Sequence, residues 1–459
     1  MRWGRPTAMG VAIAAVLAPA AAVARPVPAL RTSGPAVVAC RPDSAARIRS
    51  GWPGRGPRTA ATRRALLRLA AGCRRGRLQD AIDAAGPGTR ILVLPGVYRG
   101  AVTVRGRDRQ LEGLGRRARD VVVQGDRRAA NVIRADRADG LVIANLTAEQ
   151  GAASDVHVVR TDGFRLHRLV VRWAQDDGVR TDGADHGLLD RIEAYGNGSA
   201  GLRVGAGAEG RCGSRRGLEV RDFNVYGNVL GLWVAAGDAV WAHHARLAGN
   251  ATGAAAAPLG PQTPRGCLRL EHLSIAANNA EVYAAAAPCR TAPFARRRAG
   301  LVCPRVPTPV GTGLLLRGVN GVRVRANAIY GNRRAGVKLA WMPAAARGLL
   351  DPTRQFDTSN GNRFEDNRLG VHLDGAPAAN GVDVAWDGEG AGNCWSGDTG
   401  PAGAAPTSDR PVLPPCPRGS LFGMGDPTVQ ALEVPCAAWN PEHDPDPPGC
   451  DWFAAPPPR

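Results

Sequence analysis

The densest group of chemically capable side chains lies between Trp173 and His186. Eleven consecutive residues there contain four carboxylates and one imidazole, namely Asp176, Asp177, Asp182, Asp185 and His186. Paired carboxylates beside a histidine can protonate or cleave a glycosidic bond, and closely spaced carboxylates can equally hold a calcium ion. The candidate catalytic residues are Asp176, Asp177, Arg180 and His186, and the candidate calcium ligands are Asp176, Asp177 and Asp182.

A structural role for the same carboxylates competes with the catalytic one. Asp176 and Asp177 align with an asparagine that recurs at the corner of other repeats, as Asn197, Asn228, Asn250 and Asn332. Asparagine and aspartate at chain corners hydrogen-bond to the backbone and tolerate a left-handed φ. His186 follows Asp177 by only nine residues, so we expect it to lie away from the pair. The sequence therefore favours a structural role for Asp176 and Asp177 at a corner of the coil over a catalytic role.

The elements that must position these residues are short strands in a repeating unit. The unit is clearest at 217–228, followed by 230–234, and at 321–332, followed by 335–339; weaker copies begin near Gly140, Gly163, His186, Ala239, Cys267 and Gly361. Each copy alternates apolar and polar residues with period two, which is typical of strands. Self-similarity at this length indicates stacked supersecondary units. We therefore predict an all-β solenoid of about eight to ten coils over residues 77–395.

Stacking would align one outward side chain from each coil into a row, because strands of neighbouring coils lie about 4.7–4.9 Å apart. The row contains His157, Arg180, Arg203, Trp233, Lys338 and His372. The preceding positions are apolar and should be buried: Val156, Val179, Leu202, Leu232, Val337 and Val371. Cations with an aromatic platform could follow an acidic polysaccharide, which makes these the candidate substrate-binding residues: His157, Arg203, Trp233, Lys338 and His372. Alternatively, exposed strand positions simply carry long polar side chains.

A third group of candidate residues is rich in histidine. It comprises His167, His243, His244 and His272 with Asp190, Arg221, Asp222 and Glu271, in or beside one outward column before the corner. Imidazoles next to carboxylates could supply acid–base or metal-binding chemistry. A solvated sheet face with cross-strand charge pairs is the favoured alternative.

The N-terminus has the pattern of a secretory signal, with a basic start, an apolar stretch and a small-x-small site that ends at Ala24. We expect residues 1–24 to be removed and the mature protein to be secreted, without a membrane span. Ten cysteines on an exported chain suggest five disulfides. Pairing neighbours in sequence gives Cys40–Cys73, Cys212–Cys267, Cys289–Cys303, Cys394–Cys416 and Cys436–Cys450.

The formal net charge is +19, and Lys338 is the only lysine. Abundant Ala, Gly, Pro and Arg fit a GC-rich coding bias, so the arginine excess can reflect codon usage. A strongly positive chain nevertheless attracts polyanions at modest salt. Among polyanions we expect the partner to be an acidic polysaccharide and not a nucleic acid. We expect the protein to be a monomer. Residues 25–76 are expected to form an irregular cap with one short helix at 63–71, and the Pro-rich residues 396–459 a tail held by disulfides.

Two motifs carry a resemblance to a known superfamily. Leu78-Gln-x-Ala-Ile-x-x-Ala85, followed by Gly88-Thr-x-Ile-x-Leu-x-Pro-Gly-Val-Tyr98, resembles the opening of the pectate-lyase-like right-handed parallel β-helix superfamily. The chain is most similar to secreted actinobacterial right-handed β-helix repeat proteins, over residues 76–395. The resemblance implies a single right-handed parallel β-helix with a helical N-terminal cap. Lyases of this superfamily often use Arg or Lys as the base near carboxylate-bound calcium, which Arg180 approximates here.

The function predicted from these observations is that of a secreted carbohydrate-active protein. It would act on or bind an acidic polysaccharide, as a polysaccharide lyase or a glycoside hydrolase, with calcium as the one cofactor considered. The alternative is a non-catalytic extracellular protein that binds glycans at a cell surface. A copper-loading role is disfavoured because the sequence lacks a Met/Cys/His ligand series.

Overall fold

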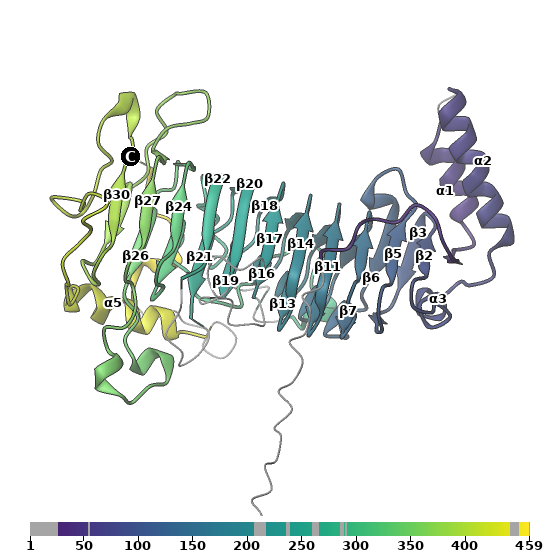
Figure 1. Cartoon of the computed structure of the whole chain (residues 1–459), viewed down its shortest axis with the longest axis horizontal. Helices are drawn as coiled ribbons and strands as arrows, with labels where there is room; N and C mark the ends of the chain where they lie inside the picture. The colour runs from purple at the N-terminus through teal and green to yellow at the C-terminus, as the bar shows by residue number, and fades with distance from the viewer. Residues whose placement is uncertain are drawn as a thin grey trace, which may run out of the picture.

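The computed structural model describes residues 26–53, 56–205, 217–235, 239–258, 266–284, 289, 292–440 and 449–458. Within them the chain winds as a right-handed parallel β-helix, as predicted, and the strands of successive coils stand side by side along its long axis (Figure 1). Strands pair in parallel with their counterparts one coil away. The predicted signal peptide, residues 1–24, lies outside the described residues. Among those described, no helix is long and apolar enough to cross a membrane.

Ten strands form one side of the coil, here called the ten-stranded sheet. They are β4 (Val102–Val104), β7 (Asn131–Asp136), β10 (Ser154–Val159), β13 (Asp177–Asp182), β16 (Ala200–Val204), β19 (Leu230–Ala235), β21 (Thr252–Ala257), β23 (Thr312–Arg317), β26 (Ala335–Ala340) and β29 (Val384–Trp386).

The other strands form the twenty-stranded sheet. They are β1 (Ala36–Ala39), β2 (Arg90–Val93), β3 (Gly96–Arg99), β5 (Gln110–Gly113), β6 (Val121–Gln124), β8 (Val142–Ala144), β9 (Thr147–Glu149), β11 (Asp162–His167), β12 (Val170–Arg172), β14 (Asp185–Asp190), β15 (Glu193–Tyr195), β17 (Leu218–Arg221), β18 (Asn224–Tyr226), β20 (Val240–Ala248), β22 (Arg269–Ala276), β24 (Arg323–Arg325), β25 (Ala328–Tyr330), β27 (Arg363–Glu365), β28 (Arg368–Leu369) and β30 (Cys394–Ser396). This sheet bends once within each coil, as between β11 and β12, and so makes the two remaining sides of the coil.

One coil shows how the sequence makes three sides. The chain passes along β10, turns at Arg160, follows β11, bends at Arg168, follows β12 and turns at Trp173 into β13. Each of these three turning residues has a positive φ, a conformation that lets the backbone change direction sharply. Between the turns, alternate side chains point inward and stack coil on coil. Val156, Val179, Leu202, Leu232 and Val337 are all buried as predicted, in one core that runs the length of the helix.

A ladder of buried asparagines stabilises the corner before the ten-stranded sheet. Asn228 illustrates it: its Oδ1 accepts from the backbone N–H and the Nδ2 of Asn197, at 3.0 and 2.9 Å, and its own Nδ2 donates to Asn250 at 3.1 Å. The ladder comprises Asn197, Asn228, Asn250, Asn278, Asn332 and Asn380. Each asparagine of the ladder therefore satisfies corner donors of the coil before it, which buried polar groups require.

The N-terminal cap is helical, as predicted, but it contains more regular structure than one short helix at 63–71 in an otherwise irregular segment. Strand β1 pairs with β2 and adds a strand to the twenty-stranded sheet. Helices α1 (Ser44–Gly51) and α2 (Pro57–Gly72) pack beyond it, and α3 (Leu78–Asp83) buries the side chains of Leu78, Ala81 and Ile82 (Figure 1). The C-terminal tail adds α5 (Pro427–Ala438).

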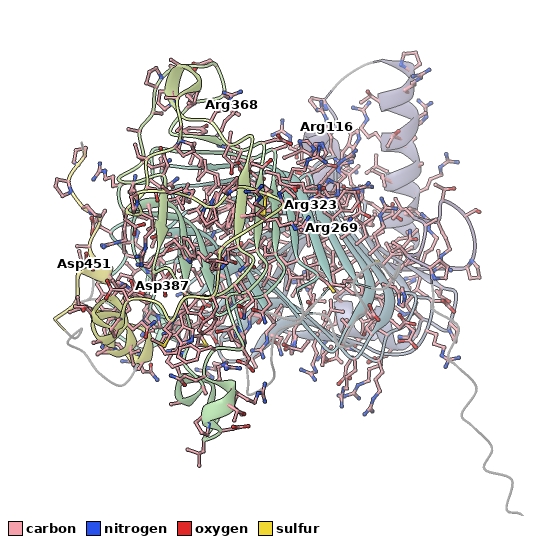
Figure 2. All side chains as sticks on the ribbon, turned by 60° about the vertical axis from the view of Figure 1, so that its left-hand side comes forward. Arg116, Arg269, Arg323, Arg368, Asp387 and Asp451 are labelled. Carbon is pink, nitrogen blue, oxygen red and sulfur yellow. A yellow bond between two sulfur atoms is a disulfide. The ribbon has the colours of Figure 1, made fainter. Side chains whose placement is uncertain are left out.

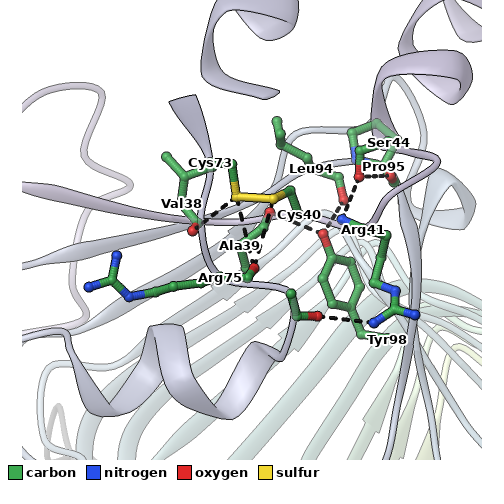
Figure 3. The surroundings of a disulfide bond; sticks show 11 residues. Val38, Ala39, Cys40, Arg41, Ser44, Cys73, Arg75, Leu94, Pro95 and Tyr98 are labelled. Atoms are coloured by element: carbon green, nitrogen blue, oxygen red, sulfur yellow. Dashed lines mark hydrogen bonds between the residues drawn. A yellow bond between two sulfur atoms is a disulfide. The ribbon is translucent and has the colours of Figure 1, made fainter. Parts of the chain in front are cut away.

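Four of the predicted disulfides are present in the described chain: Cys40–Cys73, Cys289–Cys303, Cys394–Cys416 and Cys436–Cys450. The fifth predicted pair, Cys212–Cys267, involves Cys212, which lies outside the described residues. Figure 3 shows that Cys40–Cys73 ties the cap together where Tyr98 donates to the carbonyl oxygens of Ala39 and Leu94, at 3.0 and 2.8 Å.

Candidate functional site

The predicted outward row exists on the ten-stranded sheet. Strand register places His157 beside Arg180, Arg180 beside Arg203, and Arg203 beside Trp233. Arg134, which the sequence analysis missed, precedes His157 in the same row. Its repeat has the glycine corner, because Gly125-Asp126 takes the place of Gly227-Asn228 in the register, but the next strand begins five residues after Asp126 and only two after Asn228. The alternation over 133–136 was nevertheless a usable signal. We call the five residues Arg134, His157, Arg180, Arg203 and Trp233 the polar row.

The row ends sooner than predicted. After Trp233 the register continues with Ala255 and Leu315, which are buried, and then reaches Lys338. Lys338 forms an ion pair with Glu433 of α5, so the tail occupies that end of the sheet. A pocket of about 250 Å³ remains there, lined by Lys338, Trp386, Asp387, Asp409, Arg410 and Glu433, among others.

The placement of His372 in the row was wrong. Strand β29 takes the sheet position after β26, with Ala385 beside Lys338. His372 lies instead in a loop after β28, where its backbone N–H bonds to the carbonyl of Ala376 at 2.9 Å. Val371, its supposed buried neighbour, is indeed buried, but it bridges to Pro377 outside the ten-stranded sheet. The segment 370–373 repeats the local pattern without having the pairing partners of a strand.

Carboxylates compensate most cations of the polar row. Asp182 accepts from His157 Nε2 at 2.8 Å and from Arg180 Nε at 2.6 Å. Burial acts to raise the pKa of Asp182, but these two hydrogen bonds outweigh it and lower that pKa to about 2. Two coils earlier, Asp136 accepts from Arg134 at 3.1 Å. Asp182 is thus a charged partner of two row residues, and not a free ligand.

Arg203 differs from the other cations of the row. Its guanidinium carbon lies 4.4 Å from the ring centroid of Trp233, a cation–π contact. Its nearest carboxylate is Asp177, with Nη1 3.7 Å from Oδ2, which is beyond hydrogen-bond distance. No described residue accepts a hydrogen bond from this guanidinium, so its donors remain free to bind a ligand.

Asp176 and Asp177 lie beneath this part of the row. Asp177 is buried and accepts the backbone N–H of Ala200 at 3.1 Å, while burial raises its pKa to about 6. Asp176 accepts from Arg305 Nε at 2.9 Å, and burial raises its pKa as well. Asp177 thus neighbours Arg203, and Asp176 neighbours Arg305, which lies in the inserted segment between β22 and β23.

The alignment of these aspartates with the corner asparagines was wrong. The residue that precedes Asn197 in the ladder is Ala174, whose N–H bonds to Asn197 Oδ1 at 3.0 Å. Asp177 stands three positions later, beside Ser154 at the start of β13. It is nevertheless a backbone acceptor, as the structural alternative requires.

His186 lies apart from the aspartate pair, as its spacing predicted. It belongs to β14 in the twenty-stranded sheet, is buried, and bonds through Nδ1 to Asp162 at 2.6 Å. The four candidate catalytic residues are therefore divided between two sheets. Among the described residues, no group of three His, Cys, Asp or Glu side chains is arranged to hold a metal ion, so the calcium ligands remain a prediction.

The histidine-rich group lies on the twenty-stranded sheet. Register aligns His167, Asp190, Arg221, His243 and Glu271 on successive strands, as the repeat alignment predicted. Cross-strand charge pairs connect them; His167 Nδ1 lies 2.9 Å from Asp190. Trp241, which the sequence analysis passed over, stacks on His243 with ring centroids 4.0 Å apart and is 40% exposed.

These features define the class of protein: a right-handed parallel β-helix with outward polar rows on its sheets. No family model matches the sequence, and no curated protein does. Among solved structures, the chain is similar to the A-module of a mannuronan C-5 epimerase from Azotobacter vinelandii, with 17% identity over 73% of this chain and 95% of that chain and a TM-score of 0.37.

It is also similar to an alginate lyase from a Paenibacillus species, with 12% identity over 73% of this chain and 96% of that one and a TM-score of 0.33. The Dettilon tailspike protein matches with 11% identity over 72% of this chain and a TM-score of 0.41. The chain covers 60% of that tailspike and 57% of a Geobacillus virus E2 protein, so it spans about three fifths of their lengths. Identities this low concern the fold alone.

Proposed function

We propose that this protein is secreted and binds an acidic polysaccharide along the polar row. The observation that carries the proposal is Arg203: its guanidinium is stacked on Trp233, and no described residue uses its donors. A planar guanidinium matches a carboxylate with two parallel hydrogen bonds. An adjacent indole offers an apolar surface against which a sugar ring can pack.

The rest of the polar row suits a polymer of polar units. Arg134, His157 and Arg180 follow one another on neighbouring strands, so donors recur along the helix axis about every 4.8 Å. Their charges are offset by Asp136 and Asp182, which limits non-specific attraction and leaves hydrogen bonding and stacking to select the ligand. Four disulfides support a location outside the cytoplasm.

Retention on immobilised polygalacturonate and alginate, with dextran as the neutral control, tests this proposal. We expect Arg203→Ala and Trp233→Ala each to weaken binding to the acidic polymers about tenfold, with the melting temperature maintained. Arg64→Ala on the exposed side of α2 is the matched control, and should bind like the parent protein. Unchanged binding by both row variants would refute the proposal.

Cleavage of the bound polysaccharide is a second candidate function, favoured by Asp177. A carboxyl group with a pKa of about 6 can exchange a proton near neutral pH, which general acid–base catalysis needs. Arg203 covers this carboxyl, so a sugar carboxylate that draws Arg203 toward itself would uncover it. Binding and proton transfer would then be linked.

Assays of unsaturated products and of reducing ends distinguish elimination from hydrolysis. If cleavage occurs at Asp177, Asp177→Asn abolishes product formation and leaves retention on the polymer column intact. Repeating the assay with a chelator tests the calcium prediction for Asp176, Asp177 and Asp182. A protein that binds but releases no product in either assay is the non-catalytic glycan-binding alternative.

A further inference from the structure

The twenty-stranded sheet carries a column of arginines beside an exposed tryptophan. Register places Trp241 next to Arg269, Arg269 next to Arg323, and Arg323 next to Arg363. These residues come from β20, β22, β24 and β27, and Figure 2 shows Arg269 and Arg323 close together on one face. We call the four residues the arginine column.

The positive charge of this region is largely uncompensated. Strands β20 to β28 of the sheet, with the bend at Asp366, carry six arginines and three carboxylates: Arg246, Arg269, Arg323, Arg325, Arg363 and Arg368 against Glu271, Glu365 and Asp366. Arg323 pairs with Glu365 at 2.8 Å, and Arg325 with Asp366 at 3.5 Å. Arg246, Arg269 and Arg363 form no ion pair or side-chain hydrogen bond with any residue that the structure describes, and all three are exposed.

Trp241 is held in a fixed orientation at the start of the column. Its Nε1–H donates to Glu271 Oε2 at 2.9 Å, and one face of the indole stacks on His243. An exposed and oriented indole beside unpaired guanidinium groups is a surface for a chain that has both ring faces and anionic groups. The hydrogen bond also occupies Glu271, the carboxylate nearest to Arg269 in the register.

We propose that the arginine column is a second binding surface for an acidic polysaccharide, separate from the polar row. The column spans three strand spacings, about 14 Å along the helix axis, so a polymer lying along the axis would meet the indole and then successive guanidinium groups. Uncompensated charge attracts a polyanion at a distance and makes the attraction sensitive to salt. The polar row, with its paired carboxylates, lacks this property.

The two surfaces would hold two polymer chains. Both sheets bury their inner side chains in one core, as Leu270 of the twenty-stranded sheet and Leu314 of the ten-stranded sheet do. Their outer faces therefore point in different directions. A protein with both sites can join two polysaccharide chains, which a single row does not allow.

Affinity for polygalacturonate and alginate at low and at high salt tests the second surface. The test variant is Trp241→Ala/Arg269→Ala/Arg363→Ala, and the control is Arg58→Ala/Arg64→Ala, which removes two exposed arginines from α2. We expect the test variant to lose about tenfold in affinity at low salt and little at high salt. Arg203→Ala should weaken binding at both salt concentrations, because the polar row depends less on net charge.

Mixtures of the protein with long polygalacturonate, followed by light scattering, test the joining of two chains. The parent protein should raise scattering at sub-saturating amounts, and both Arg203→Ala and the triple variant should abolish this rise. If the triple variant keeps the affinity and scattering of the parent protein while Arg203→Ala loses them, the second surface is refuted and the polar row stands. If Arg203→Ala keeps them while the triple variant loses them, only the polar row is refuted. Binding of a single-stranded oligonucleotide by the arginine column more tightly than either glycan would overturn the assignment to polysaccharide.

Discussion

The carboxylate oxygen Oδ2 of Asp177 lies 3.7 Å from Nη1 of Arg203 on the next coil. The carboxylate is buried and the guanidinium is half-buried, with its central carbon 4.4 Å from the ring centroid of Trp233. Arg203 therefore contacts both a buried acid and an aromatic platform without being hydrogen-bonded to either. This arrangement leaves a cation that can move toward an incoming anion.

The pKa of Asp177 predicts how stability depends on pH. Because burial raises this pKa from 3.8 to about 6, the folded protein binds the proton more tightly than the unfolded chain does. Below about pH 4 this carboxyl is protonated in both the folded and the unfolded state, and its contribution to the free energy of unfolding is most favourable. That contribution falls between pH 4 and 6, and above pH 6 the buried charge lowers the free energy of unfolding by about 3 kcal/mol. Asp177→Asn removes this cost and keeps an acceptor for the N–H of Ala200.

Thermal unfolding of Asp177→Asn at a series of pH values measures this effect. We expect a higher melting temperature than the parent at pH 7 and the same one at pH 4. A lower melting temperature at pH 7 would mean that attraction to Arg203 outweighs the cost of burial, and would contradict the prediction.

The asparagine ladder should be a main contributor to stability. Asn228→Ala removes the acceptor of two Asn197 donors and leaves them buried and unpaired. We expect a loss of about 2–4 kcal/mol in the free energy of unfolding, since each buried unsatisfied group costs about 1–3 kcal/mol. Asn224→Ala is the matched control on the exposed face of β18, where a change within about 0.5 kcal/mol is expected. Equal losses in the two variants, measured by denaturant unfolding, would argue against the ladder.

Close approach of the coils demands glycine near the start of β19 in the ten-stranded sheet. A Cβ on Gly231 would lie 2.3 Å from the carbonyl oxygen of Gly253 on the next coil. Gly231→Ala should cost about 2–3 kcal/mol, because backbone must move to admit the methyl group. Gly51→Ala, where a Cβ meets nothing within 4 Å, should leave the melting temperature unchanged. A tolerated Gly231→Ala would show that the stack can widen locally.

The Cys40–Cys73 disulfide should stabilise the cap without affecting the polar row. It links β1 to the residue after α2, across a loop of 33 residues. We expect Cys40→Ser/Cys73→Ser to cost about 3–4 kcal/mol in the cap and to speed proteolysis within residues 40–73. Retention on acidic polymers should stay at the parent level. A loss of polymer binding would show that the cap contributes to the site.

Periodicity within the sequence was enough to identify which faces of the coil are buried. Alternation with period two is a local property of strands, so Val179, Leu202 and Leu232 were assigned to the core correctly. The neighbouring cysteine pairs were also correct where the structure describes them, because each pair closes one short loop. Neither the alternation within a strand nor the closure of a short loop depends on contacts between residues far apart in the sequence.

Contacts between distant parts of the chain set the register across insertions and the partners of the charged side chains. His372 follows the local pattern, yet β29 pairs with β26, because inter-coil hydrogen bonds choose the strand. Asp177 stands three positions from its supposed alignment for the same reason. Arg305 reaches Asp176 across 129 residues, and Glu433 reaches Lys338 from the tail. Such contacts depend on where the inserted segments pack, which strand periodicity does not encode.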